Sequence, residues 1–296
     1  MKRNYFICAV ATILLFSLGS CKHQDRMLLR FSQTDTNMQL EDATLFDFVW
    51  KDGVLQQVRK NNPFAHSDSL YEDYAAIFNY TLDYAYKDGG LSSLSGNKFH
   101  SEFVYENGRL VRIDQFSKDG ILAYRVTFDQ GDSNKVKAVY YAMTEESIKW
   151  LESNLYPRND STGARVCMEM PEDTTLHVKA EANYQWNNDN LVYAKVSFAE
   201  GLVVESHMEY DSKINPFYRT YCEFDRLDVL AISLPFGFNN SGVSKNNVTK
   251  AVVSSQLAGE ETSETIFENT YEYDGDYPIV QRSNQNASEY HYEYEK

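Results

Sequence analysis

Basic residues are scarce in this chain of 296 residues. Lys and Arg number 28 against 43 Asp and Glu, which gives a formal net charge of −15 at pH 7. Nucleic-acid phosphates are bound through clustered Lys and Arg, and a peripheral hold on anionic lipid needs the same residues. The composition therefore argues against nucleic acid as a partner and favours a soluble body that avoids negatively charged surfaces.

The motifs of the common enzyme chemistries are missing as well. The sequence contains no Gly-x-Ser-x-Gly elbow, no phosphate-binding Gly-Lys-Ser/Thr loop, no His-Glu-x-x-His and no Cys-x-x-Cys. No cofactor is expected, and a non-catalytic protein is favoured. Carboxylates are plentiful, however, and the two acids of a glycoside hydrolase cannot be recognised from spacing. A glycan hydrolase that uses paired carboxylates stays open as the alternative.

Cysteine is rare. Cys8 lies in the N-terminal apolar run and Cys21 directly follows that region, which leaves Cys167 and Cys222. An oxidising compartment would permit a disulfide between these two residues. Both also lie in strand-like surroundings, where buried free thiols are common. Paired and free forms both stay open.

A long apolar run occurs once, at the N-terminus. Lys2 and Arg3 precede an apolar run over residues 5–16, which is shorter than the roughly 20 residues of a spanning helix. The sequence then reads Leu18-Gly19-Ser20-Cys21, the pattern of a lipobox. We expect residues 1–20 to be a lipoprotein signal peptide, Cys21 to carry the lipid, palmitate included, and residues 21–44 to form a tether.

The expected anchor sets the location of the protein. Loss of Lys2 and Arg3 takes the net charge from −15 to −17. Several acyl chains hold a protein to a membrane stably, because each buried methylene contributes about 0.8 kcal/mol. Lys22 follows the lipidated cysteine, whereas an Asp there would favour the inner membrane. We therefore predict a cell-envelope protein anchored in the outer membrane, facing either the periplasm or the outside.

The rest of the chain shows the patterns of antiparallel β-structure. Asp-Gly and Asn-Gly pairs recur at short intervals, for example at residues 52–53, 88–89 and 107–108, and these pairs favour two-residue hairpin turns. Apolar and polar residues alternate between the turns, as in residues 202–210. Such alternation predicts a sheet with one packed face and one solvated face.

The hairpins are also similar to one another. Residues 48–58, 84–91, 103–113, 184–191 and 271–277 each read aromatic-x-aromatic, then a turn, and in most cases an aliphatic strand. A hairpin cannot bury its apolar face alone, so such units must add edge to edge. We predict one all-β domain over residues 45–296, an extended twisted antiparallel meander that either stays open or curls into a barrel or sandwich. Short helices are expected near residues 144–155 and 69–78, and a long loop over 235–247.

Two histidines stand between carboxylates on single strand faces. Glu205, His207 and Glu209 form one row, and Glu289, His291 and Glu293 form the other. Imidazole and carboxylate suit zinc, so the rows would form a metal site if their strands lay together. A solvated charged face is the favoured interpretation, because such rows are common on exposed sheets.

Several motifs together resemble a known family. They are Asn215-Pro216-Phe217, Leu234-Pro235-Phe236-Gly237, the stretch 244–250 with its SKNN start, and the late tyrosine-rich segments 271–278 and 290–294. With the lipobox and the hairpins, they resemble Bacteroidetes lipoproteins that carry a domain of unknown function with YD-like repeats. The resemblance covers most of residues 45–296 and implies an all-β fold in a bacterial envelope. It implies no catalytic residue.

The expected function is therefore binding. A rigid, lipid-tethered sheet with interspersed aromatic residues suits an extended ligand, either a glycan or an envelope protein partner. Trp50, Trp150 and Trp186 are the candidates for stacking on sugar rings.

Overall fold

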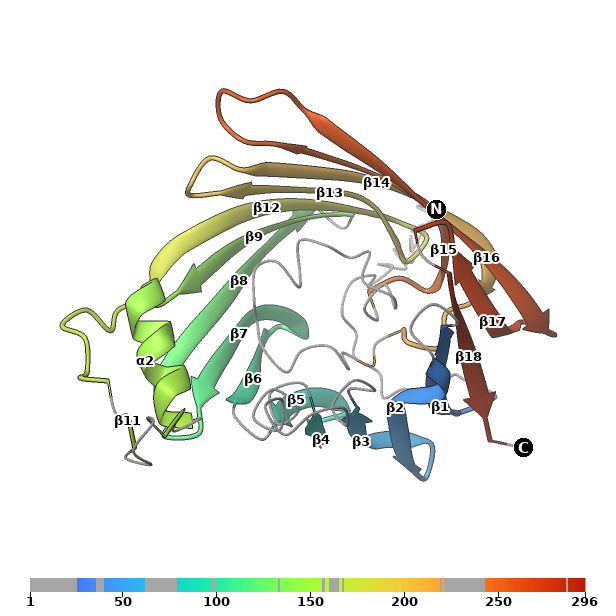
Figure 1. The fold of residues 1–296 in the computed structure, drawn as a ribbon, viewed down its shortest axis with the longest axis horizontal. Helices are drawn as coiled ribbons and strands as arrows, with labels where there is room; N and C mark the ends of the chain where they lie inside the picture. The colour runs from blue at the N-terminus through green and yellow to red at the C-terminus, as the bar shows by residue number, and fades with distance from the viewer. Residues whose placement is uncertain are drawn as a thin grey trace, which may run out of the picture.

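The computed structural model describes residues 26–35, 40–61, 79–96, 99–132, 134–155, 158–159, 165–166, 168–218, 220, 243–285 and 287–295. Nearly all of this part of the chain forms one closed antiparallel barrel of 16 strands (Figure 1). The all-β prediction is confirmed, and of the forms left open the barrel is the one adopted. No helix in these segments is long and apolar enough to cross a membrane.

The strands follow one another around the barrel in chain order, and β1 closes the ring between β2 and β18. The wall consists of β1 (Leu28–Asp35), β2 (Leu40–Lys51), β3 (Val54–Lys60), β4 (Tyr80–Lys87), β5 (Gly90–Ser95), β6 (Phe99–Glu106), β7 (Arg109–Ser117), β8 (Leu122–Asp132), β9 (Lys135–Ala142), β12 (His177–Asn187), β13 (Asn190–Phe198), β14 (Val203–Ile214), β15 (Asn246–Gln256), β16 (Ser263–Asp274), β17 (Tyr277–Ser283) and β18 (Ser288–Tyr294). Between β9 and β12 stand the helix α2 (Glu145–Leu155) and a separate pair, β10 (Arg158–Asn159) and β11 (Arg165–Val166).

The domain begins earlier than the sequence suggested. β1 and the start of β2 fall within residues 21–44, which we expected to be tether, and the structure places both in the wall. β1 pairs with β18 from the other end of the chain, and Leu28 and Phe31 are fully buried. Pairing between the two chain ends leaves no local sequence pattern, so alternation and turn signals could not reveal it.

The up-and-down course gives the barrel two distinct ends. One end, here called the turn rim, carries the two-residue turns at Asp52-Gly53, Asp88-Gly89 and Asn107-Gly108, together with the start of β1 and the end of β18. The other end, the far rim, carries α2 and the connections after β7, β13, β15 and β17. Both residues of the three turns have positive φ, for example 51° at Asn107 and 76° at Gly108, the conformation that Asn-Gly and Asp-Gly favour. The predicted hairpins are therefore confirmed.

Every repeated hairpin carries the same irregularity. The second aromatic residue of each unit lies at a shift in strand register just before the turn, and these residues are Trp50, Tyr86, Tyr105, Trp186 and Tyr273. A shift of this kind adds a residue to one strand and bends it. The repeat therefore encodes a bent hairpin, and a succession of bent hairpins curls a sheet into a barrel.

Neighbouring hairpins are joined near the turn rim by side chains, which we call clasps. The Tyr105 hydroxyl donates to the carbonyl oxygen of Leu91 at 3.0 Å, although the backbone ladder between β5 and β6 ends at Ser93 and Glu102. Five equivalent bonds of 2.5–3.0 Å join Trp50 to Leu28, Tyr86 to Leu55, Gln130 to Leu110, Tyr210 to Leu191 and Tyr294 to Pro278. The clasps connect hairpins where their backbones no longer pair.

Side chains alternate between the two faces of the wall. The inner face is apolar and aromatic, and Phe31, Leu82, Leu94 and Tyr140 are at most 2% exposed. The outer face carries a charged residue in nearly all the strands, among them Arg30, Asp47, Asp83, Glu102, Arg125, Lys137, Glu181, Lys195, Glu205, Lys250, Glu268, Arg282 and Glu289. Ion pairs cross this face, such as Arg30 to Asp47 at 3.0 Å and Arg125 to Asp114 at 2.5 Å.

A connecting segment enters the barrel from the turn rim after β14. Phe217 is 1% exposed, and its ring centroid lies 5.1 Å from that of Phe31 and 5.9 Å from that of Tyr292. The Tyr84 hydroxyl donates to the carbonyl oxygen of Thr220 at 2.5 Å, across the interior. This segment therefore forms part of the core inside the ring of strands.

The helix predicted near residues 144–155 is confirmed as α2. Its N-cap is Thr144, whose Oγ1 accepts a hydrogen bond from the Ser147 backbone N–H at 3.2 Å. Glu145 and Glu146 in the first turn suit the helix dipole. The helix predicted over 69–78 lies outside the described residues, as does most of the loop predicted over 235–247; β15 begins at Asn246.

Candidate functional site

The two histidine rows lie on the outer wall but far apart. Three strands separate β14, which carries Glu205, His207 and Glu209, from β18, which carries Glu289, His291 and Glu293. At about 4.8 Å per strand, the rows are on the order of 19 Å apart. Among the described residues, no group of three or more His, Cys, Asp or Glu side chains is placed to hold a metal ion. The structure therefore does not bring the two rows together.

Each row instead makes local contacts. Glu205 lies between Lys195 Nζ at 3.2 Å and His207 Nε2 at 3.5 Å. In the other row, Glu289 Oε1 accepts a hydrogen bond from Arg282 Nε at 2.6 Å. Such pairing is what the outer faces of solvated sheets show.

The three tryptophans take part in packing. Trp50 Nε1 donates to the Leu28 carbonyl at 2.7 Å, and Trp186 Nε1 donates to the Val243 carbonyl at 3.2 Å. Both indoles pack against the core, and Trp150 on α2 is only 9% exposed. All three indoles thus take part in packing contacts, with Trp50 and Trp186 partly buried. Cys21, Cys167, Cys222 and residues 1–20 lie outside the described residues.

The outer wall is hollowed over β8, β9, β12 and β13, in what we call the outer-wall depression. Its volume is about 400 Å³, and the side chains that line it include Asp129, Lys137, Asn183, Gln185 and Tyr193. These residues come from adjacent strands in register: Lys137 stands opposite Asp129 and Asn183, and Gln185 stands opposite Tyr193. The depression is therefore built by regular strands, whose register sets the backbone positions of its side chains.

Tyr193 is the aromatic member of this surface. On β13 the inward positions are Ala194, Val196 and Phe198, so Tyr193 is an aromatic residue on the polar face. Its ring centroid lies 5.0 Å from that of His207 on the next strand, in a tilted arrangement. The sequence interpretation missed this residue, although an aromatic residue that interrupts an otherwise polar face was the available signal.

The acidic group beside the depression is held ionised. Partial burial opposes ionisation of Glu205, but the hydrogen bond and charge of Lys195, with smaller contributions from His207 and Tyr193, outweigh it and lower the Glu205 pKa. Burial and the Glu205 carboxylate together raise the pKa of Tyr193. The surface thus presents a neutral phenol, amides, ammonium groups and carboxylates to solvent.

A second hollow, of about 610 Å³, lies where the described chain begins. Arg26, Asp274, Ile279 and Tyr294 line it, together with the acids Glu293 and Glu295. Arg26 bonds Asp274 across it at 2.6 Å. Because this ion pair occupies polar groups of the hollow, the first depression is the better candidate for ligand binding.

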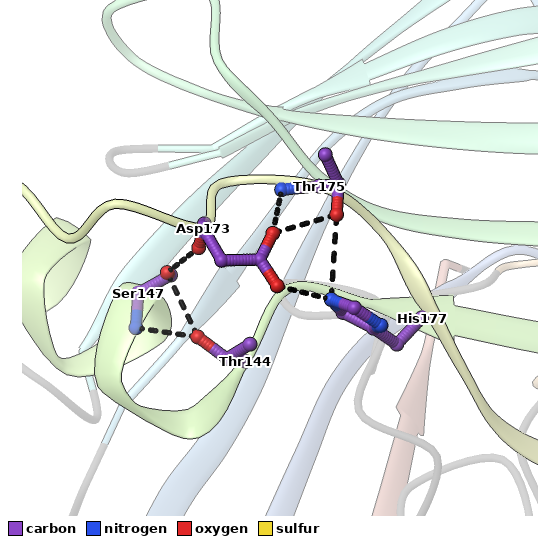
Figure 2. A network of polar contacts seen from close by, with 5 residues as sticks. All are labelled: Thr144, Ser147, Asp173, Thr175 and His177. Carbon is purple, nitrogen blue, oxygen red and sulfur yellow. Dashed lines mark hydrogen bonds and ion pairs between the residues drawn. The ribbon is translucent and has the colours of Figure 1, made fainter.

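A Ser, a His and an Asp do meet at the base of α2 (Figure 2). Asp173 Oδ2 lies 2.7 Å from His177 Nε2, but the Ser147 hydroxyl donates to the Asp173 carbonyl oxygen at 2.5 Å. A catalytic triad needs that hydroxyl on the imidazole. The cluster therefore attaches the helix to the segment before β12 and does not activate a nucleophile.

Polar residues at the turn rim hold the segment that enters the barrel. Asn215 Nδ2 donates to the Ser244 carbonyl at 2.8 Å, and Ser244 Oγ in turn accepts from the Leu191 N–H at 3.1 Å. Asn190 and Asn246 exchange two bonds of 2.9 Å. The motifs at 215–217 and 244–247, far apart in sequence, thus form one network.

Comparison with known proteins gives no family. No family model matches the chain, and no curated protein matches it. Among solved structures, a porin-like protein from Bacteroides vulgatus has 7% identity and a TM-score of 0.40, covering 92% of this chain and 99% of that one. A porin-like protein from Bacteroides uniformis has 8% identity and a TM-score of 0.34, covering 90% and 98%. At such values the likeness says nothing about function.

Proposed function

We propose that this chain is a non-catalytic lipoprotein of the cell envelope, held by a lipid on Cys21, whose barrel binds an oligosaccharide at the outer-wall depression. The observation that carries the proposal is the depression itself. Its volume of about 400 Å³ falls in the range of ligand sites. Tyr193 supplies an apolar ring for a sugar face, and Asn183 and Gln185 supply donors and acceptors for its hydroxyls.

The charged outer wall supports an aqueous setting for the barrel. A membrane-embedded barrel carries an apolar band on its outside, and Lys or Arg at the bilayer midplane costs about 2–4 kcal/mol. Here Arg125, Lys137 and Lys195 lie on the outer face within their strands. We therefore place the whole barrel in water, with the lipid as its attachment.

No carboxyl group of the described chain stands out as the acid of a glycoside hydrolase. A glycoside hydrolase needs one carboxylic acid whose pKa is raised so that it stays protonated. The carboxyl groups with a displaced pKa in this part of the chain are Glu145, Asp173 and Glu205, and all three are displaced downward. Release of a cleaved product is therefore the observation that separates the hydrolase alternative from binding.

Binding of a panel of envelope-type oligosaccharides, measured by calorimetry, tests the proposal. Tyr193→Ala is expected to weaken binding about 5- to 30-fold, because a lost aromatic contact and its buried area are worth roughly 1–2 kcal/mol. Tyr141→Ala is the matched control, since Tyr141 lies on the outer face of β9 away from the depression. Equal effects of the two substitutions, or release of a cleaved product, would contradict it. Binding of a protein and of no glycan would favour the partner alternative.

A further inference from the structure

The start of the described chain is fixed at the turn rim. Arg26 Nη1 donates to Asp274 at 2.6 Å, and the Arg26 backbone N–H donates to the Tyr277 hydroxyl at 3.2 Å. The guanidinium carbon also lies 5.5 Å from the centre of the Tyr277 ring. Asp274 and Tyr277 flank the turn between β16 and β17. Any attachment N-terminal to Arg26 therefore reaches the barrel at this rim.

The chain available before Arg26 is short. Cys21 lies five residues earlier, and five residues span at most about 18 Å when fully extended. Strands of 8–12 residues, tilted as in closed barrels, make a wall on the order of 20–30 Å high. A lipid on Cys21 thus keeps the turn rim within about 18 Å of the membrane, whereas it sets no such limit for the far rim.

Charge is distributed unevenly between the rims. Acidic residues outnumber basic ones in the described connections of the far rim: Asp119, Glu145, Glu146, Glu152, Glu169, Glu172, Asp173, Glu200, Glu260 and Glu261, against Lys118, Lys149, Arg158 and Arg165. The described connections and chain ends of the turn rim carry fewer acids, Asp52, Asp88, Asp189, Asp276 and Glu295, against Arg26 and Lys245, so the excess of acids is smaller there. An anionic membrane repels acidic groups within a Debye length of about 8–10 Å. The far rim is therefore the end that such a surface repels more strongly.

We propose that the turn rim is the face that the barrel holds against the membrane, with the far rim and α2 directed away from it. The inference rests on the lipid anchor of the proposed function and adds an orientation to it. The outer-wall depression lies toward the same end, because Gly131 and Lys135, which line it, flank the turn between β8 and β9. Its ligand is therefore bound close to the lipid surface.

Quenching of a fluorophore by nitroxide-headgroup lipids measures this orientation. The full chain is produced in cells with its own signal peptide, so that it is lipidated. It carries Cys167→Ser and Cys222→Ser, so that these two cysteines are not labelled. It is then reconstituted into vesicles of phosphatidylethanolamine and phosphatidylglycerol. Label is placed at Lys87→Cys on the turn rim or at Lys118→Cys on the far rim. The two positions are matched, because both are exposed lysines at the ends of strands or turns.

Quenching is expected to be several-fold stronger at position 87 than at position 118. Equal quenching, as from a barrel lying on its side, or stronger quenching at position 118 overturns the orientation while leaving the anchor intact. Failure of the chain to float with the vesicles instead contradicts the lipid anchor, and the orientation with it. Glycan binding is measured separately and does not depend on either result.

Discussion

Phe217 shows how much of the barrel interior depends on single side chains. Its ring contacts Phe31 on β1, Phe48 on β2 and Tyr292 on β18, so it touches the strands on both sides of the closure. The Phe217 N–H donates to Asn215 Oδ1 at 3.0 Å, which links the ring to the polar network of the turn rim. A motif residue that looked like one more aromatic in the sequence is thus a central part of the core.

Phe217→Ala is expected to lower the free energy of unfolding by about 3–5 kcal/mol, because it leaves a cavity among aromatic rings that cannot all move to fill it. Chemical denaturation followed by tyrosine fluorescence measures the loss. Phe116→Ala, at a half-exposed position on β7, is the control and should cost clearly less. Equal losses would show that Phe217 is not a core residue.

The Asp173 carboxylate makes the turn before β12 dependent on pH. Hydrogen bonds from the Thr175 hydroxyl and backbone N–H, then from His177, lower the Asp173 pKa from 3.8 to about 2. A carboxyl group with a depressed pKa contributes stability above its unfolded pKa and loses it as pH falls through the folded value. Asp173→Asn should therefore lower Tm at pH 7, and its difference from the wild type should shrink between pH 4 and pH 2.

Glu172→Gln serves as the control for that experiment, because the neighbouring side chain is exposed and outside the cluster in Figure 2. A difference between wild type and Asp173→Asn that stayed constant down to pH 2 would rule out this role for the carboxylate.

At the scale of the element, the repeated hairpin combines features that sequence can and cannot reveal. Asp-Gly and Asn-Gly pairs predicted the positions of the turns correctly, because the backbone preferences of these residues are local. Alternation over residues 202–210 identified a strand with one packed face for the same reason, and Val204 and Met208 are buried on it. The register shift before each turn and the clasp beyond it were not foreseen, since each depends on how two hairpins meet.

Removal of one clasp hydroxyl is expected to cost about 0.5–1.5 kcal/mol of stability. Tyr105→Phe would leave the Leu91 carbonyl without that donor, while the ring keeps its packing. Tyr86→Phe removes the next clasp, and the double variant should show the sum of the single losses if the clasps act independently. Tyr141→Phe on the outer face is the reference, and a loss no larger than that reference would refute the role of the clasp.

At the scale of the whole molecule, closure joins residues from opposite ends of the chain. Gln33 on β1 donates to Ser288 on β18 at 2.8 Å, and Ser288 donates to Asp35 at 2.5 Å. Sequence predicted a meander but could not choose between open sheet, sandwich and barrel, because pairs this distant have no local signature. The outer-wall depression was missed for a related reason: its residues lie on four strands, and only their register brings them together.

The charged outer wall predicts how the intact barrel behaves without lipid. The chain beginning at Lys22 is expected to stay monodisperse in detergent-free buffer at pH 7, because paired charges such as Arg30 with Asp47 cover the wall. Size-exclusion chromatography with light scattering measures this. A chain that aggregates unless detergent is added, while keeping its β-signal in circular dichroism, would indicate a lipid-facing wall instead.

The clasps also bear on how such a barrel can arise and change in size. Each clasp donor bonds a carbonyl at the equivalent position of the preceding strand pair, as Tyr86 bonds Leu55 and Tyr105 bonds Leu91. Each hairpin therefore supplies a donor to the hairpin before it and an acceptor carbonyl to the hairpin after it. A hairpin copied in tandem would therefore have a clasp donor for the hairpin before it and a clasp acceptor for the hairpin after it. Duplication or loss of gene segments could therefore change the circumference of the barrel by whole hairpins. The strands nearest the two chain ends would still pair to close the ring.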